Sequence, residues 1–112
     1  MRILIATRRL LIKRYGDSVS FSILYHPEVV KRDIPKLNSD IRKRIKRAIE
    51  NRLLTAPHEY GEPLRKTLKN YWKLRAGDYR IVFRVAENEV IIPGICHRKE
   101  VYLLMEKRQN QA

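Results

Sequence analysis

A segment in the second half of the chain carries cations at a spacing that suits phosphate chemistry. Its sequence, NYWKLRAGDYRIVFRV (residues 70–85), reads as two short strands joined by a tight turn at Ala76–Asp78. Side chains alternate along a strand, so one face of this hairpin is apolar. The other face carries four cations, Lys73, Arg75, Arg80 and Arg84. No carboxylate interrupts that face before the hairpin ends, and the pattern therefore favours a polyanion or a phosphate over bulk water.

Two further residues, Arg98 and Tyr102, follow the next predicted strand and are expected beside the same face. Cations can hold a scissile phosphate and stabilise the extra charge of its pentacoordinate transition state. A tyrosine can stack on a base or orient a proton. RNA carries its own nucleophile, the 2′-OH, so cleavage without a metal needs only positioning, a base, an acid and charge stabilisation. The combination favours RNA as the ligand.

Composition and charge point to an anionic partner. The chain has 112 residues, the length of one small domain, and 44% of them are hydrophobic, which argues against disorder. Lys and Arg number 25 against 12 Asp and Glu, giving a net charge of +13. The single cysteine excludes an internal disulfide and indicates the reducing cytosol. We expect no membrane span, metal or cofactor, because no apolar run is long enough and no Cys/His cluster or Gly-rich phosphate loop is present.

Hydrophobic periodicity predicts an α+β domain. A strand over Val19–Tyr25 precedes a short helix over Pro27–Asp33. A second helix is expected after an N-cap at Asn38 or Ser39. Its apolar stripe consists of Ile41, Ile45, Ala48, Ile49 and Leu53. The hairpin and a strand over 89–97, with a bulge or a locally unpaired edge at Pro93-Gly94, complete a small antiparallel twisted sheet with the two N-terminal helices packed on one face.

Further cations on the second helix and near the hairpin are candidates for RNA binding. They are Lys43, Arg44, Lys46, Arg47, Arg75, Arg84 and Lys99. Two interpretations of the helix cations remain open, a solvated helix back or a phosphate-contacting surface. Arg75 and Arg84 could instead pair with Glu62, Glu87 or Glu89 at the surface. We expect structural roles for His97 and Cys96, since alternation places His97 opposite Arg98 and no base adjoins the thiol.

Residues 1–16, MRILIATRRLLIKRYG, form a basic N-terminal extension that we place outside the single domain of residues 17–112. Arg8 and Arg9 divide its apolar run, so it lacks the unbroken core of a signal peptide. Three interpretations remain open, namely a basic amphipathic helix, an extra edge strand or a mis-assigned start.

Two blocks of the sequence resemble the signature blocks of the RelE/ParE toxin superfamily, and of its RelE branch in particular. The first, LRAGDYRIVFRV (Leu74–Val85), matches an L-R-x-G-x-Y-R-hydrophobic strand pair. The second, GICHRKEVY (Gly94–Tyr102), matches a G-H-R…V-Y ending, with Cys96 where glycine is common. The resemblance extends from about Val19 to Leu104. Together the two blocks are a fairly specific signal.

This resemblance implies a toxin of a type II toxin–antitoxin system, a ribosome-dependent endoribonuclease that cuts messenger RNA in the decoding site. It places four residues on a metal-independent catalytic surface. Lys73 would act as or assist the base on the 2′-OH, and Arg80 would stabilise the phosphate. Arg98 would assist the leaving 5′-oxygen electrostatically, since arginine is a poor proton donor, and Tyr102 would stack or orient. Some members carry a second lysine two residues before Lys73, where this chain has Tyr71.

The resemblance also implies the partners, which are messenger RNA, the ribosome and an adjacent antitoxin that we expect to be acidic and amphipathic. Two other functions remain open. One is a ParE-like poison of DNA gyrase that does not cut RNA, and the other is a non-catalytic nucleic-acid-binding domain. ParE-like chains usually lack the H-R…Y ending that His97, Arg98 and Tyr102 supply. That ending favours the endoribonuclease.

Overall fold

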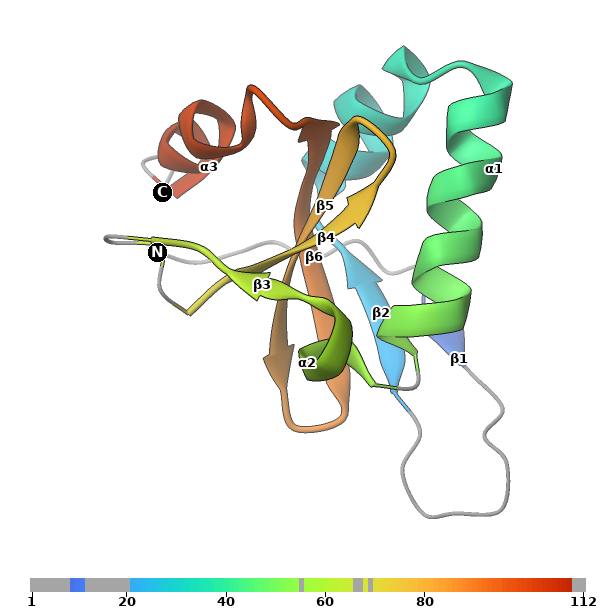
Figure 1. Cartoon of the computed structure of the whole chain (residues 1–112), viewed down its shortest axis with the longest axis vertical. Helices are drawn as coiled ribbons and strands as arrows, with labels where there is room; N and C mark the ends of the chain where they lie inside the picture. Colours follow the sequence, from blue (N-terminus) through green and yellow to red (C-terminus); the bar gives the residue numbers. More distant parts are fainter. Residues whose placement is uncertain (1–8, 12–20, 55, 66–67, 69, 110–112) are drawn as a thin grey trace.

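The computed structural model describes residues 9–11, 21–54, 56–65, 68 and 70–109. In this part of the chain, six strands form one twisted sheet in the order β1–β2–β6–β5–β4–β3 (Figure 1). The strands are β1 (Arg9–Leu11), β2 (Ser22–Tyr25), β3 (Glu62–Pro63), β4 (Trp72–Ala76), β5 (Tyr79–Ala86) and β6 (Glu89–His97). Helices accompany the sheet, and the predicted α+β class is confirmed.

The strand pair predicted around Gly77 is the hairpin β4–β5. Gly77 has a backbone φ of +63°, a left-handed conformation that glycine adopts without a steric penalty. Next to β5, β6 continues the antiparallel order. From Gly94 to Ile91, β6 advances by three residues while β5 advances by two, so β6 carries one extra residue at this point. The bulge expected at Pro93-Gly94 is therefore present.

The sheet is mixed, because β2 pairs with β6 in parallel. Ser22 lies opposite Glu89, and Tyr25 lies opposite Ile92. This pair corrects the expectation of an antiparallel sheet. Hairpin turns impose antiparallel pairing on consecutive strands, whereas the chain passes through helices and the β4–β5 hairpin between β2 and β6. The alternation of side chains within each strand carries no information on that direction.

The predicted N-terminal helices lie on one side of the sheet. The first is a pair of short helical segments, η1 (Val29–Asp33) and η2 (Ile34–Lys36). The second is α1 (Ser39–Ala48), continued by η3 (Ile49–Leu53) and followed by the short α2 (Pro57–Tyr60). Asn38 is the N-cap of α1, as expected, because its side-chain oxygen accepts a 2.9 Å hydrogen bond from the backbone N–H three residues later.

The main core lies between these helices and the sheet. The predicted helical stripe is buried there, with Ile45, Ile49 and Leu53 at most 4% exposed. The sheet contributes large side chains to the same cluster, including Ile23, Leu74, Ile81, Phe83, Val90 and Ile92. Burying apolar side chains on one face of a helix and one face of a sheet is the main driving force for this arrangement.

The opposite face of the sheet is partly covered by α3 (Val101–Gln109), on the other side of the sheet from α1 (Figure 1). Val101 and Met105 of α3 pack with Tyr71, Val82 and Cys96 in a second apolar cluster. The sequence pattern predicts cations on this face, and the structure shows that an apolar cluster shares the face with them. The helix reaches it through a turn after β6 that sequence periodicity does not reveal.

Of the N-terminal extension, only Arg9–Leu11 fall within the described residues. They form β1, which pairs antiparallel with β2 at one edge of the sheet and agrees with the edge-strand interpretation. Residues 1–8 and 12–16, on which the other two interpretations depend, lie outside the described part. Among the helices that the structure describes, none combines the length and apolarity that a membrane span requires.

Candidate functional site

The hairpin β4–β5 brings the predicted cations together as cross-strand neighbours. Lys73 lies opposite Val82, and Arg75 lies directly opposite Arg80. Like charges directly opposite in an antiparallel pair, with Cβ atoms about 5 Å apart, repel each other and destabilise the sheet. Within the described residues, no carboxylate forms an ion pair with Lys73, Arg75, Arg80 or Arg84. A bound anion would remove this repulsion.

Arg80 is held at the turn end of the hairpin. Its Nη1 donates hydrogen bonds to the backbone oxygens of Gly77, at 3.0 Å, and Tyr79, at 2.9 Å. The side chain is half-buried, and the two hydrogen bonds hold its guanidinium near the surface. Two carbonyl contacts to one nitrogen restrict the planar group without neutralising its charge.

Arg98 reaches the same end of the sheet from the turn after β6. Its backbone N–H donates to the Asp78 carbonyl at 2.8 Å, which fastens this turn to the hairpin turn. Its Nε lies 3.8 Å from Asp78 Oδ1, and the two side chains are 53% and 74% exposed. Such an exposed ion pair is weak, so the guanidinium can exchange Asp78 for another anion.

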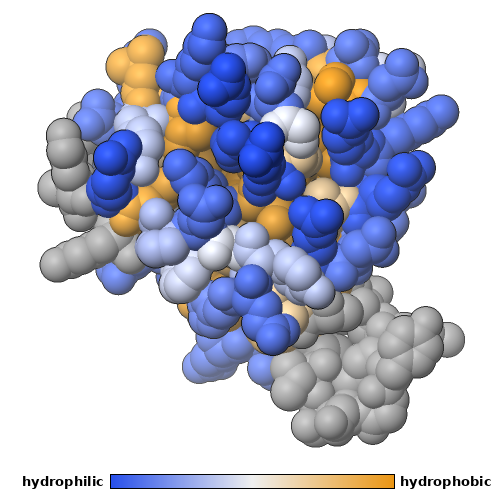
Figure 2. All heavy atoms as spheres, viewed as in Figure 1, coloured by the Kyte–Doolittle hydropathy of each residue, from blue (hydrophilic) through white to orange (hydrophobic). Residues whose placement is uncertain are grey.

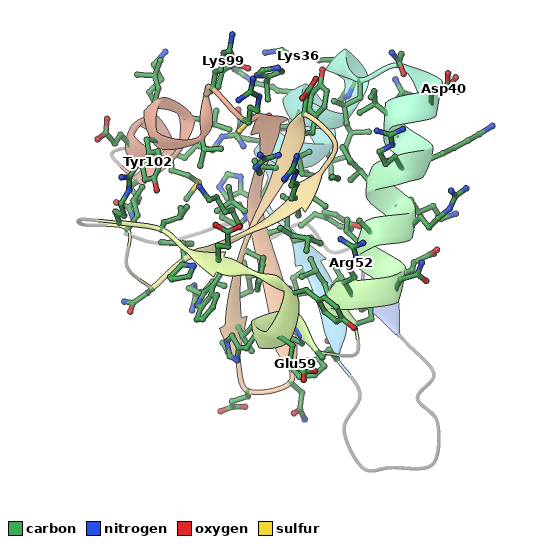
Figure 3. The ribbon with its side chains drawn as sticks, viewed as in Figure 1. Lys36, Asp40, Arg52, Glu59, Lys99 and Tyr102 are labelled. Carbon is green, nitrogen blue, oxygen red and sulfur yellow. The ribbon has the colours of Figure 1, made fainter. Side chains whose placement is uncertain are left out.

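Tyr102 lies in the first turn of α3 (Figure 3), and two cations lie near its ring. The Lys73 Nζ is 5.8 Å from the centre of its ring, and the Arg65 Cζ is 5.3 Å from it. The Arg65 Nε also donates a long hydrogen bond of 3.4 Å to the phenol oxygen. The structure thus joins Tyr102 to Lys73, and Lys73 is a diagonal neighbour of Arg80 across the hairpin.

The two cations change the acidity of the phenol. Partial burial opposes ionisation of Tyr102, but the hydrogen bond from Arg65 and the charges of Lys73 and Arg65 together lower the pKa of Tyr102 below its ordinary value of 10.0. A phenol with a lowered pKa gives up its proton more readily than an isolated tyrosine.

Arg65 is a candidate site residue that the sequence pattern does not reveal, because only its contact with Tyr102 marks it. It lies in a polar segment between β3 and β4, where the sequence has neither helical nor strand periodicity. Its contact with Tyr102 joins residues 37 positions apart. The only sequence signal is its place within a basic stretch, PLRKTLK, and such stretches are common on protein surfaces.

Two of the predicted helix cations, Arg44 and Arg47, meet Arg75 in a groove between α1 and the β4 edge. A hollow of about 370 Å³ is lined there by Arg44, Arg47, Ala48, Asn51, Arg52, Arg75, Ala76 and Gly77. The Arg44 guanidinium lies over Gly77, where a Cβ atom would come within 2.6 Å of Nη1. We call this hollow the arginine groove. Arg52 lies at the end of the α1–η3 helix beside it (Figure 3).

The remaining predicted RNA-binding residues lie apart from this groove. Lys43 and Lys46 are exposed on α1, and Lys46 lines a different cleft. Arg84 lies farther along β5 from the turn, and Lys99 lies in the exposed turn between β6 and α3. Hydrophilic side chains dominate the face seen in Figure 2, with smaller apolar areas between them. The structure therefore gathers three of the seven residues, Arg44, Arg47 and Arg75, in one place.

His97 and Cys96 occupy structural positions. The His97 ring packs edge-on against Tyr79 at 5.7 Å, and its Nδ1 accepts a 3.2 Å hydrogen bond from the Lys99 backbone. Burial, with the nearby charges of Asp33 and Glu100, raises the pKa of Cys96 to about 12, so the thiol stays protonated. No group of three or more metal-ligating side chains occurs among the residues that the structure describes.

Comparisons with known proteins identify the family. Residues 23–102 match the sequence model described as the ParE toxin of the type II toxin–antitoxin system parDE. Among curated protein sequences, none matches significantly. Two solved structures are similar to this chain. The toxin–antitoxin complex RelBE2 from Mycobacterium tuberculosis is 26% identical with a TM-score of 0.63, over 71% of this chain and 100% of that one. The RelB–RelE antitoxin–toxin complex from Methanococcus jannaschii is 28% identical with a TM-score of 0.51, over 70% and 93% of the chains.

Proposed function

This chain belongs to the ParE toxin family of type II toxin–antitoxin systems, within the RelE/ParE superfamily, and on that premise we propose that it is a ribosome-dependent endoribonuclease that cuts messenger RNA. The observation that carries the proposal is the position of Lys73, which lies beside the Tyr102 ring and diagonally across the hairpin from Arg80. Arg98 reaches the hairpin turn at the same end of the sheet, where its one described ion pair, with Asp78, is exposed. The similarity to two RelE-type complexes supports the same branch.

The proposed reaction is an internal transfer at a phosphodiester of RNA. The 2′-oxygen attacks the adjacent phosphorus, loses its proton to Lys73 or to a base that Lys73 assists, and displaces the 5′-oxygen of the next nucleotide. Arg80 stabilises the charge on the phosphate, and Arg98 stabilises the leaving oxygen, which takes up a proton. Tyr102 stacks on a base or orients the proton. The products are a 2′,3′-cyclic phosphate and a 5′-OH end.

The arginine groove supplies a second contact region for the same RNA. A chain of phosphates bound at Arg80 can continue past Arg75, which lies directly opposite on the hairpin, toward Arg44 and Arg47 of α1. Each phosphate contact of this kind adds affinity that is lost in salt and carries no sequence preference. We assign the groove to RNA binding and the Lys73–Tyr102 region to cleavage.

Cleavage of a ribosome-bound messenger tests the proposal. Purified protein is added to ribosomes stalled on a defined messenger, and the cut ends are mapped by primer extension and end-group analysis. We expect 2′,3′-cyclic phosphate products, and a single 2′-deoxynucleotide at the cut site should block that cut. Cleavage that continues at the 2′-deoxy position would refute the 2′-OH mechanism.

For the partner, we propose an acidic antitoxin with an amphipathic segment that docks between the N-terminal helices. A cleft of about 410 Å³ lies there, with apolar lining residues that include Val30, Ile34 and Ile45. Two cations, Arg42 and Lys46, and one carboxylate, Glu50, also line it, so apolar side chains flanked by carboxylates that face the cations would complement it in both shape and charge. Val30 is 44% exposed in the free chain. Val30→Asp should weaken antitoxin binding without affecting RNA cleavage.

A second candidate function is favoured by the matching family description, which names ParE toxins. In this alternative the basic surface binds DNA gyrase and no RNA is cut. Growth arrest with intact messenger and with gyrase trapped on DNA would establish it. The ribosome assay separates the two functions, because a gyrase poison leaves the stalled messenger uncut.

A further inference from the structure

A buried ion pair links the N-terminal helical segments to α3. Asp33 ends η1, and Arg108 lies in the last turn of α3, 75 residues later in the chain. Arg108 donates from Nη1 to Asp33 Oδ2 and from Nη2 to Asp33 Oδ1, both at 2.7 Å. The two side chains are 7% and 5% exposed. Because burying two ions carries a large desolvation penalty, stability alone is a weak explanation for this pair.

The pair is attached to β6 at the point where β2 ends. β2 covers β6 only as far as Ile92. Beyond that residue, the Ile95 N–H donates to Asp33 Oδ2 at 2.9 Å, and the Pro93 carbonyl accepts from Arg108 Nη1 at 2.8 Å. These bonds replace the strand partners that β6 lacks beyond β2. They also fix the C-terminal turn of α3 to a defined position on the sheet.

Arg108 completes the buried stripe of α3. Val101, Met105 and Arg108, spaced i, i+4 and i+7, are the buried residues of this helix. Val101 and Met105 bury the first two turns of α3, whereas Leu103 on the other side is 60% exposed, and Arg108 is the buried residue that anchors the last turn. Tyr102 lies about 100° around the helix axis from Val101. The rotation of α3 therefore decides whether the phenol reaches its cationic neighbours.

The surroundings of the pair leave room for that rotation to change. A cleft of about 360 Å³ lies beside it, lined by residues of η2 and α3 that include Lys36, Leu104 and Lys107. On the sheet side α3 packs closely, since a Cβ atom at Gly94 would lie 3.2 Å from Leu104 Cδ2 and 3.4 Å from Arg108 Nη1. Because one side of α3 faces this cleft, the helix orientation depends on the contacts at the sheet side, which are those of Val101 and Met105 and the ion pair at the last turn.

We propose that the Asp33–Arg108 pair positions Tyr102, by fixing the rotation of α3 so that the phenol stays against Arg65 and Lys73. Neither residue of the pair touches the substrate in this proposal. Its consequence for RNA cleavage rests on the proposed function. Its consequence for the phenol does not, because the contacts of Tyr102 exist in the free protein.

The test removes the pair without leaving a buried ion unpaired. Asp33→Asn combined with Arg108→Met keeps an acceptor for the Ile95 N–H and keeps a long side chain at the second position. Absorbance titration of the phenols, taken as the difference from the same protein carrying Tyr102→Phe, should show the pKa of Tyr102 moving up toward its ordinary value. Cleavage on ribosomes should show kcat lower by roughly 10- to 100-fold, the scale for a misplaced group, with KM little changed.

A matched control removes a more exposed ion pair from the same region. Arg32 Nε lies 2.8 Å from Glu28 Oε1, and the two side chains are 69% and 23% exposed. Glu28→Gln combined with Arg32→Gln should leave both the phenol titration and kcat unchanged. An unchanged Tyr102 titration in the folded Asp33/Arg108 variant would overturn the inference. A phenol that responds in a protein that cleaves no RNA would support the inference while refuting the proposed function.

Gly94→Ala provides a second test, which changes no charge. It tests the proposal even if the Asp33/Arg108 double variant does not fold. The added methyl would lie 3.2 Å from Leu104 Cδ2 and 3.4 Å from Arg108 Nη1, so it presses on α3 and on the ion pair from the sheet side by a few tenths of an ångström. We expect the pKa of Tyr102 to rise in this variant as well. A titration identical to that of the parent protein, in a variant whose fold is intact by circular dichroism, would overturn the proposal.

Discussion

Arg80 is held by backbone carbonyls of the hairpin turn, and Arg98 by contacts with Asp78. Both lie at the same end of the sheet, so each should be needed for the proposed reaction. Arg80→Ala should reduce messenger cleavage on ribosomes by roughly 100-fold or more, the scale for losing one transition-state donor, and Arg98→Ala should be comparable. Tyr102→Phe should be milder, because the ring can still stack. The free energy of unfolding should change by about 1 kcal/mol or less, since these side chains make few buried contacts.

The control for these variants is Lys31→Ala, which removes an exposed cation of η1. It should leave cleavage unchanged although it alters the net charge by the same amount. Full cleavage by the Arg80→Ala, Arg98→Ala double variant would refute the site assignment.

The acidity of Tyr102 depends on Arg65, so Arg65→Gln should raise the pKa of the phenol. Absorbance titration measures this shift, and Arg75→Gln, on an exposed arginine without a described contact to Tyr102, is the control. Because the folded-state pKa lies below the unfolded value near 10, the linked stabilisation is fully present only above pH 10. It is lost as the pH falls through the folded-state value. The denaturation midpoint of Arg65→Gln should therefore differ from that of the parent protein more above pH 10 than at pH 7.

At the scale of elements, β1 is the strand whose removal should reduce the stability of the fold least. It contributes three residues at one edge, paired only with β2 among the described strands. A chain beginning at Asp17 should fold, keep its activity and lose about 1–3 kcal/mol of stability, since each ladder hydrogen bond is worth about 1 kcal/mol. Denaturant melts measure this loss. A loss above about 5 kcal/mol would show that residues 1–16 belong to the core.

For the whole molecule, the net charge of +13 should govern encounter with the antitoxin. Long-range attraction between a basic toxin and an acidic partner speeds association, whereas the apolar contacts made afterwards determine dissociation. Raising the salt concentration should therefore lower the association rate much more than it raises the dissociation rate. Stopped-flow mixing or surface binding at several ionic strengths measures both rates. An association rate that does not respond to salt would contradict an electrostatic encounter.

Those features of the chain that depend on neighbouring residues were predictable from its sequence. The stripe ending at Leu53, the Asn38 cap, the Gly77 turn and the Pro93-Gly94 bulge each arise from local periodicity or local backbone preference. The α+β class follows from the order of these elements, and the toxin family follows from two short blocks of residues. In the candidate site, strand alternation alone placed the four hairpin cations on one face.

Contacts between distant residues were decided only by the tertiary structure. The parallel pairing of β2 with β6, the approach of Arg65 to Tyr102 and the bidentate Asp33–Arg108 pair join segments separated by 37 to 75 residues. No periodic pattern specifies such partners, because each side chain satisfies its local element equally well in many tertiary arrangements. They are selected when the apolar faces of the helices and the sheet pack together, since packing allows few relative positions and buried polar groups must then find partners there.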